Sequence, residues 1–183
     1  MYGNKMGAFF SYFWVGKQED SAALDKEDPT TGLTPRQVQF ITDTWTLVKK
    51  DIRGNGVDLF MRLFRIRPEL QKRFSSFADM PLEELAKSKR LQAHTNSVMY
   101  ALDSVVDSLN DPECLNEMLL KIGENHGRRR ITERDFMDLK VVFMQLLKDK
   151  LDIHLTPYGE EAWSKTVDVI YKGIFEGLKG KIS

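Results

Sequence analysis

The sequence predicts an all-α protein built as a single domain. Apolar residues recur at spacings of three and four over most of residues 33–180, which is the period of an amphipathic helix. No segment shows the sustained alternation of apolar and polar residues that marks a half-buried strand. At 183 residues the chain is long enough for one hydrophobic core and too short for two ordinary ones.

The composition narrows the class of protein. Lys+Arg and Asp+Glu each number 27, so the formal net charge is zero and the basic excess that attracts nucleic acid is missing. The single cysteine, Cys114, excludes an internal disulfide and favours a reducing compartment. The longest apolar stretch, residues 6–16, is shorter than the roughly 20 residues that a membrane-spanning helix needs. We therefore expect a cytoplasmic protein that does not bind nucleic acid.

Three regions are expected along the chain. Residues 1–32 form a flexible N-terminal extension, residues 33–180 form the folded domain, and residues 181–183 form a short tail. Within the extension, residues 17–32 are polar and acidic and follow neither the helical nor the strand period. We interpret that segment as a linker.

The extension also contains a pattern for lipid attachment. A chain that began at Met6 would place Gly7 directly after the initiator and Ser11 where N-myristoylation requires a serine or threonine. As written, Met1 and Tyr2 prevent this modification. We expect either a disordered tail or, after acylation at Gly7, a peripheral membrane anchor.

The first helix of the domain is expected to begin at Pro35. Thr34 can cap it, Pro35 suits the first helical position, and Gln37 completes a capping box. One face then carries the apolar residues Val38, Ile41, Trp45, Val48 and Ile52. We expect Gly54 and Gly56 to interrupt this helix.

A second helix is expected from about Val57 to Arg67. It must end there because Pro68 disfavours helical geometry in the residue before it. Its apolar residues are Val57, Phe60, Leu63 and Phe64. After a short segment at residues 68–77, one long helix is expected from about Pro81 to Leu109.

Three further helices each begin at a capping signal. These signals are Asp111 with Pro112, Thr132 with Asp135, and Thr156 with Pro157. The apolar residues at helical spacing are Leu115, Leu119 and Ile122 in the first, Phe136, Leu139, Phe143, Leu147 and Leu151 in the second, and Trp163, Val167, Ile170, Ile174 and Leu178 in the third.

Two of the three histidines are predicted to point inward. His94 lies four residues before Val98 on the apolar stripe of its helix. His126 lies four residues after Ile122 on the buried stripe of another helix. His154 lies at a helix C-terminus, where a cation is favourable, and we expect it to have a structural role.

Two inward histidines allow two interpretations. They are either ordinary core residues bonded to backbone carbonyls, or ligands of a shared cofactor. A tetrahedral zinc site lacks its ligands, because the sequence has no HExxH, no CxxC and no third histidine or carboxylate at ligand spacing. A planar iron cofactor needs only one or two imidazoles between apolar walls, and the sequence supplies these.

Taken together, these residues resemble the globin family over nearly all of residues 33–180. Trp45 falls where first helices of globins carry a tryptophan, and Phe74 matches the phenylalanine that stacks on the heme. His94 matches the distal histidine, Val98 the residue one turn later, and His126 the proximal ligand. The resemblance implies a globin fold, with about seven to eight helices around a heme pocket.

The resemblance also implies a set of site residues. The cofactor would be heme b, iron protoporphyrin IX, with iron bound by His126 on the proximal side and by His94 on the distal side. The matching heme-contact positions are Phe60, Phe74, Phe77, Val98, Ile122, Ile131, Phe136 and Leu139, with Arg130 as a propionate partner or, alternatively, a solvated helix end.

The N-terminal extension and the EEAW segment at residues 160–163 resemble the neuroglobin and globin X types rather than familiar hemoglobins. This implies reversible binding of oxygen, carbon monoxide and nitric oxide at six-coordinate iron, with a sensing or redox role, in a monomer or weak dimer. Three alternatives stay open: a conventional five-coordinate globin for oxygen transport or storage, a cofactor-free helical interaction module, and an enzyme acting on nitrite or nitric oxide, for which no residue specifies a substrate pocket.

Overall fold

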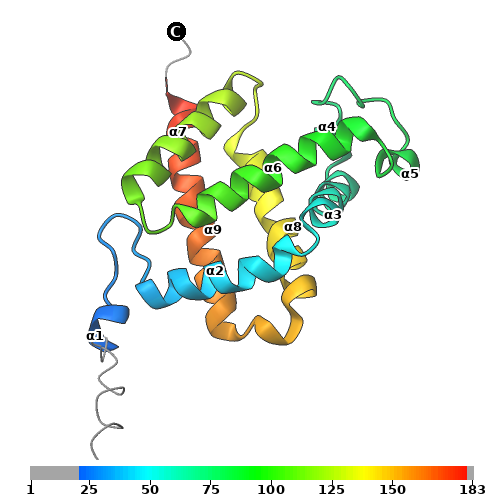
Figure 1. Cartoon of the computed structure of the whole chain (residues 1–183). Coiled ribbons are helices and arrows are strands. Elements are labelled where there is room, and N and C mark those ends of the chain that lie inside the picture. The colour runs from blue at the N-terminus through cyan, green and yellow to red at the C-terminus, as the bar shows by residue number, and fades with distance from the viewer. Residues whose placement is uncertain (1–20, 181–183) are drawn as a thin grey trace, which may run out of the picture.

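The computed structural model describes residues 21–180, and this part of the chain is all-helical, as predicted. It contains nine α-helices and one 3-10 helix and no strand (Figure 1). The helices are α1 (Ser21–Leu24), α2 (Pro35–Lys49), α3 (Ile52–Ile66), α4 (Pro68–Gln71), α5 (Leu82–Leu85), α6 (Lys89–Asp107), α7 (Pro112–Gly127), α8 (Glu133–Leu151), the 3-10 helix η1 (Asp152–His154) and α9 (Pro157–Lys179).

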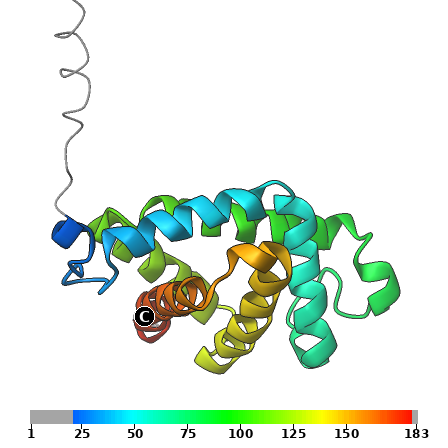
Figure 2. The same ribbon diagram turned by 90° about the horizontal axis from the view of Figure 1, so that it is seen from below.

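The six long helices pack around one core. Figure 2 shows α2 and α6 along one side of the molecule and α8 and α9 along the other, with α3 toward one end and the segment of α5 beyond it. The helix α7 lies against α9, and α3 contacts both α6 and α8. None of the helices in residues 21–180 is long and apolar enough to cross a membrane.

The predicted helix starts are confirmed. At α2 the Thr34 side chain accepts from the Gln37 N–H while the Gln37 side chain accepts from the Thr34 N–H, a complete capping box. Thr132 and Asp135 form the equivalent box at α8. The other two signals also cap, with the Asp111 carboxylate accepting from the Cys114 N–H and the Thr156 hydroxyl accepting from the Gly159 N–H. These local signals therefore fix where three of the long helices and α2 begin.

The break between the first two helices is not where the sequence predicted it. The chain turns at residues 50–51, and Asp51 caps α3 by accepting from the Gly54 N–H at 3.0 Å. Gly54 and Gly56 lie inside α3. A Cβ on Gly56 would lie 2.8 Å from the Met99 Cγ on α6, so this glycine serves the crossing of α3 and α6 rather than a break.

The long helix predicted for residues 81–109 is two elements. The four-residue α5 ends at Leu85, and α6 begins at Lys89 after Ser88, whose hydroxyl accepts from the Leu91 N–H. The Gln92 amide donates to the Ala86 carbonyl and closes the corner between them. Ser88 is a capping residue that a continuous apolar stripe concealed.

The C-terminal part of the predicted linker is attached to the domain. Within it, Asp25 pairs with Arg36 at 2.8 Å and Glu27 pairs with Lys165 of α9 at 2.6 Å. Thr31 is buried. The acidic residues that suggested a solvated linker therefore contact the basic side chains of α2 and α9. Gly7 and its myristoylation pattern lie outside the described residues.

Two tryptophans join α2, α6 and α9 in the centre of the core. The rings of Trp45 and Trp163 lie 6.0 Å apart, and both residues are almost fully buried. Each indole N–H has a partner: Trp45 donates to the Asp103 carboxylate at 2.8 Å, and Trp163 donates to the Thr44 hydroxyl at 3.1 Å. This cluster holds α6 in place along its C-terminal half, away from His94.

Candidate functional site

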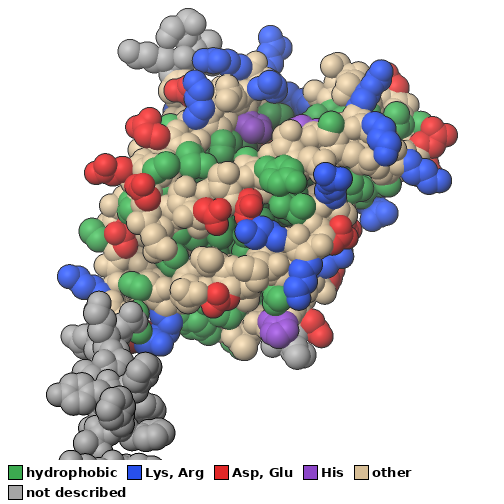
Figure 3. Space-filling view, in the orientation of Figure 1, with side chains coloured by type: hydrophobic (Ala, Val, Ile, Leu, Met, Phe, Trp, Pro, Cys, Tyr) green, Lys and Arg blue, Asp and Glu red, His purple; other side chains and the backbone are tan. Residues whose placement is uncertain are grey.

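The structure brings His94 and His126 to one site. His94 lies in the first half of α6 and His126 in the last turn of α7. Burial lowers the pKa of the His94 imidazole below its ordinary value, and the charges of His126 and Arg129 lower it further, so these groups lie near one another. Figure 3 shows histidine side chains at two neighbouring places on the upper edge, where the surface dips between two lobes, and another at the lower edge.

His126 is held in the tautomer that a metal ligand requires. Its Nδ1 lies 2.8 Å from the carbonyl oxygen of Ile122, one turn earlier on α7. In a neutral ring this contact places the proton on Nδ1, because a carbonyl can only accept. The Nε2 lone pair then remains, and Nε2 has no hydrogen-bond partner among the described residues. The helix itself therefore orients His126 as an electron-pair donor.

His94 is not a satisfied core histidine. Neither of its ring nitrogens forms a hydrogen bond within residues 21–180, although the side chain is half-buried. It instead packs against the edges of two aromatic rings, Phe60 at 5.1 Å and Phe74 at 4.9 Å. The lowered pKa keeps the ring neutral at pH 7, with a lone pair available.

Four phenylalanines form a wall behind His94. Phe60 is buried and touches Phe64 and Phe74 as well as His94. Phe77 stacks on Phe74, with ring centroids 5.0 Å apart and planes 15° apart, and it is only 4% exposed. Phe77 was predicted to be the neighbour of Phe74 and a heme contact; it does lie against Phe74, in a second row with no ring contact to His94, and its contact with heme stays a prediction.

The His126 side of the site has its own aromatic cluster. Phe136 on α8 lies 5.2 Å from the His126 ring and is buried. Behind it lie Tyr171 at 5.5 Å and Phe175 at 6.1 Å, both on α9. Neither residue was predicted from the sequence to line the site, although their spacing of four puts them on one helix face.

Other predicted wall residues are half-buried apolar side chains next to the histidines in the chain. Val98 lies one turn after His94, Ile122 lies one turn before His126, and Ile131 donates its N–H to the His126 carbonyl at 3.2 Å. Leu139 lies on α8, three residues after Phe136, and is also half-buried. Apolar residues that are left half-exposed beside unpaired imidazoles fit an apolar group that binds between them.

Arginines surround this site without carboxylate partners. Arg130 is exposed and has a φ of 59°, and its carbonyl accepts from the Arg73 guanidinium at 3.1 Å. Arg129 donates to the Asn125 carbonyl at 2.7 Å. Within the described residues, neither Arg73, Arg129 nor Arg130 forms a salt bridge. The structure thus leaves positive charge for an anionic group at the predicted position, Arg130, and at two neighbours.

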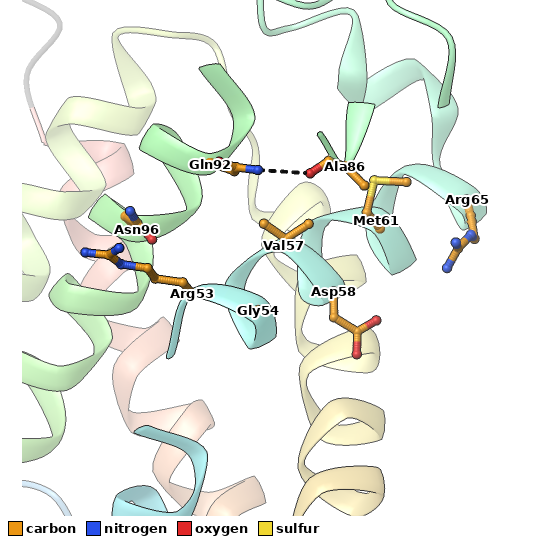
Figure 4. A pocket seen from close by; sticks show the side chains of 9 residues that line it. All are labelled: Arg53, Gly54, Val57, Asp58, Met61, Arg65, Ala86, Gln92 and Asn96. Carbon is orange, nitrogen blue, oxygen red and sulfur yellow. Dashed lines mark hydrogen bonds between the residues drawn. The ribbon is translucent and has the colours of Figure 1, made fainter. Parts of the chain in front are cut away.

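A separate pocket of about 600 Å³ lies between α3 and α6, away from both histidines (Figure 4). In Figure 4, Arg53 of α3 and Asn96 of α6 approach each other on one side of it, and Val57 and Met61 of α3 face it. Gln92 and Asn96 flank His94 in sequence at two-residue spacing, so they lie on other faces of α6. One wall of this pocket is therefore formed by the helix that carries His94.

The donor set fits an iron porphyrin. Two imidazoles with free ring nitrogens lie near one another on different helices, with aromatic walls on each side and arginines at the surface. By contrast, residues 21–180 contain no cluster of three or more His, Cys, Asp or Glu side chains that could hold a metal ion alone. The site is therefore suited to a metal that already carries an apolar, planar ligand.

Known proteins match the chain over most of its length. A family model described as Globin matches residues 57–174. Cytoglobin-2 of Danio rerio is 31% identical over 157 residues, which cover 85% of this chain and 87% of that protein. The match to the family model runs from within α3 to within α9 and includes both histidines.

Solved structures with the same helix arrangement include a hexa-coordinate hemoglobin of Drosophila melanogaster, with a TM-score of 0.74 and 27% identity over 78% of this chain and 94% of that chain. A hexacoordinated heme protein of an anhydrobiotic tardigrade has a TM-score of 0.78 over 84% of this chain and 99% of that chain. Its 18% identity makes this second likeness one of fold alone.

Proposed function

This chain belongs to the globin family, and on that premise we propose that it holds heme b between His126 and His94, with both imidazoles bound to iron when no gas is present. The observation that carries the proposal is the difference between the two rings. His126 is oriented by its bond to the Ile122 carbonyl, whereas His94 is neutral and bonded to nothing among the described residues. Two free lone pairs in one apolar site would supply two ligands to heme iron.

Heme supplies an iron that binds diatomic gases reversibly. The protein's part is to fix the ligands and exclude water. The carbonyl of Ile122 holds the proton of the neutral His126 ring on Nδ1, which leaves Nε2 available as a ligand. Phe136 packs against the same ring and restricts its rotation. We assign His126 as the permanent ligand.

His94 would act as an internal competitor for the gas. Its position against Phe60 and Phe74 leaves the ring neutral and without a rival hydrogen bond, so nothing in the described residues opposes its binding to iron. A gas could then bind only to those molecules in which His94 has dissociated from iron. Its apparent affinity is lowered by that fraction.

The structural neighbours support this assignment. The Drosophila hemoglobin is described as hexa-coordinate, and it is similar to this chain in both sequence and fold. A globin with an internal ligand exchanges that ligand for a gas or accepts electrons with little change in coordination. We therefore propose a sensing or redox role rather than oxygen transport. The finer likeness to neuroglobin or globin X stays a prediction.

A five-coordinate oxygen-storage globin is the second candidate. Phe60 and Phe74 hold His94 by ring-edge contacts, and the same position would let His94 donate a hydrogen bond to bound oxygen instead of binding iron. In both candidate functions Arg130 would pair with a heme propionate, because its side chain is exposed and forms no salt bridge within the described residues.

Absorption spectra in both oxidation states test the proposal. Purified protein should carry an intense Soret band and give low-spin six-coordinate spectra in the ferric and ferrous forms. His94→Leu should keep its heme and become five-coordinate in the ferrous form. A colourless protein that takes up no hemin would favour the cofactor-free interaction module, and a five-coordinate ferrous parent would favour the oxygen-storage globin.

Location is a separate proposal. Cys114 is a free, exposed thiol on α7, as suits a reducing compartment, and we propose that the protein is cytoplasmic. A chain that starts at Met6 would be acylated at Gly7 and bind the cytoplasmic face of a membrane. The intact mass of that chain made with an N-myristoyltransferase tests this, with Gly7→Ala as the control. An unmodified mass would reject the lipid anchor.

A further inference from the structure

The helix that carries His126 rests on α9 by direct backbone contact. An ideal Cβ built on Gly123 would lie 2.1 Å from the Ile174 carbonyl oxygen and 2.8 Å from the Gly177 Cα. A Cβ on Gly177 would lie 2.2 Å from the Leu120 carbonyl oxygen and 3.0 Å from the Gly123 Cα. No side chain separates the two helices at this point, so neither position accepts even a methyl group without moving a backbone.

This contact belongs to a reciprocal pattern of glycines. Gly123 and Gly127 are four residues apart on α7, and Gly173 and Gly177 are four residues apart on α9. The two helices lie side by side in Figure 1 and make extensive contact. The contact is looser at one end only: a Cβ on Gly173 would lie 2.8 Å from the Leu119 Cβ, whereas one on Gly127 would meet nothing closer than 3.4 Å.

The glycine contact lies within one turn of the proximal ligand. Gly123 directly follows Ile122, whose carbonyl orients the His126 ring, and it precedes His126 by three residues. Any displacement of α7 from α9 therefore moves the His126 ring as one unit with the carbonyl that orients it. The hydrogen bond at Nδ1 survives such a movement, while the position of Nε2 relative to a cofactor changes.

We propose that Gly123 and Gly177 are positioning residues for the iron, a role that rests on the proposed binding of heme by His126. Their backbone contact fixes how far α7 stands from the cofactor and hence the length and strain of the bond from His126 to iron. Bonds to iron tolerate displacements of roughly 0.2 Å. A methyl group on Gly123 would lie 2.1 Å from the Ile174 carbonyl oxygen, so the two helices must separate until this distance reaches ordinary contact, which is a much larger movement.

The experiment measures the iron–histidine bond directly. Resonance Raman spectra of the ferrous protein give the iron–histidine stretching frequency, and the His94→Leu background makes the iron five-coordinate so that only the bond to His126 is observed. Gly123→Ala is compared with Gly127→Ala in that background. The second variant is the matched control, because it makes the same change on the same helix next to His126, at a site with room for the methyl group.

We expect Gly123→Ala to shift the stretching frequency and Gly127→Ala to leave it unchanged. Hemin release should be roughly tenfold faster in Gly123→Ala, the lower end of the cost of losing outer-shell support at a metal site. A merely structural role would lower the melting temperature of the heme-free protein without moving the frequency. Gly123→Ala with the frequency of the control would therefore overturn the inference.

Two further outcomes keep the test decisive. If Gly123→Ala does not fold, Gly173→Ala takes its place, because its methyl group would lie nearest the Leu119 side chain, at 2.8 Å, rather than 2.1 Å from a backbone carbonyl. A smaller shift in the same direction is then expected, and an unshifted band overturns the inference. If the His94→Leu parent shows no iron–histidine band at all, the assignment of His126 fails, which is a failure of the proposed function and is recognised before any glycine variant is made.

Discussion

The two histidines are held by helix crossings of different stiffness. On the His126 side, α7 meets α9 through backbone atoms of Gly123 and Gly177. On the His94 side, α6 meets α3 at Gly56, where a Cβ would lie 2.8 Å from the Met99 Cγ and no closer than 3.3 Å to a backbone atom, the Thr95 carbonyl oxygen. A pocket of about 600 Å³ lies between α3 and α6 as well. The difference indicates that α7, which carries the proposed permanent ligand His126, is fixed against α9, and that α6, which carries the proposed exchangeable ligand His94, has more room to move.

The largest expected effect comes from removing the fixed ligand. His126→Ala should leave heme held only by apolar contacts and arginine pairing, and hemin release should accelerate by about a hundredfold or more. Because heme binds the folded protein and not the unfolded chain, the melting temperature should fall as well. His154→Ala is the matched control, since His154 is exposed on η1. Equal hemin release by the two variants would contradict the role of His126.

A smaller effect is expected from filling the softer crossing. Gly56→Ala adds a methyl group that Met99 can accommodate by changing its rotamer. The free energy of unfolding should therefore fall by only about 1 kcal/mol. The stretching frequency of the bond from His126 to iron should not change, while the fraction of six-coordinate iron should fall as α6 shifts. These properties are measured by urea unfolding and by Raman and absorption spectra. A shift of the iron–His126 stretching band in Gly56→Ala would contradict the difference in stiffness between the two crossings.

The smallest effect is a pH dependence in the heme-free protein. Burial and the charges of His126 and Arg129 lower the pKa of His94 below its ordinary value of 6.5. As the pH falls through that value, the unfolded chain takes up a proton at this residue before the folded chain does, so stability is lost toward acid. Urea midpoints from neutral pH to about pH 5 should fall less steeply in His94→Leu. Equal slopes in the two proteins would show that His94 titrates normally.

Local patterns in the sequence predicted much of this arrangement. The capping boxes at Thr34 and Thr132 involve residues three apart, so their partners are settled by the chain itself. The inward direction of His94 and His126 follows from helical periodicity alone. The hydrogen bond from His126 to Ile122 joins residues four apart on one helix, and the spacing allowed it.

The remaining features depend on which helices meet. Gly54 and Gly56 suggest a helix break until α6 is known to cross at Gly56, and Asp51, which makes the real break, is an ordinary capping residue. The glycine pairs of α7 and α9 are visible as spacings, but only the packed structure shows that they face each other. The second-row position of Phe77 likewise depends on the fold of the segment between α4 and α5. Tertiary contact decides each of these.

The rate of carbon monoxide binding to the ferrous protein tests the central claim most directly. If His94 occupies the sixth position of iron and must leave before a gas can bind, the observed rate should rise with carbon monoxide concentration and then level off at the rate of His94 release. His94→Leu should bind faster, with a rate that stays proportional to concentration. Proportional rates in both proteins would show that His94 does not ligate iron and would contradict the account.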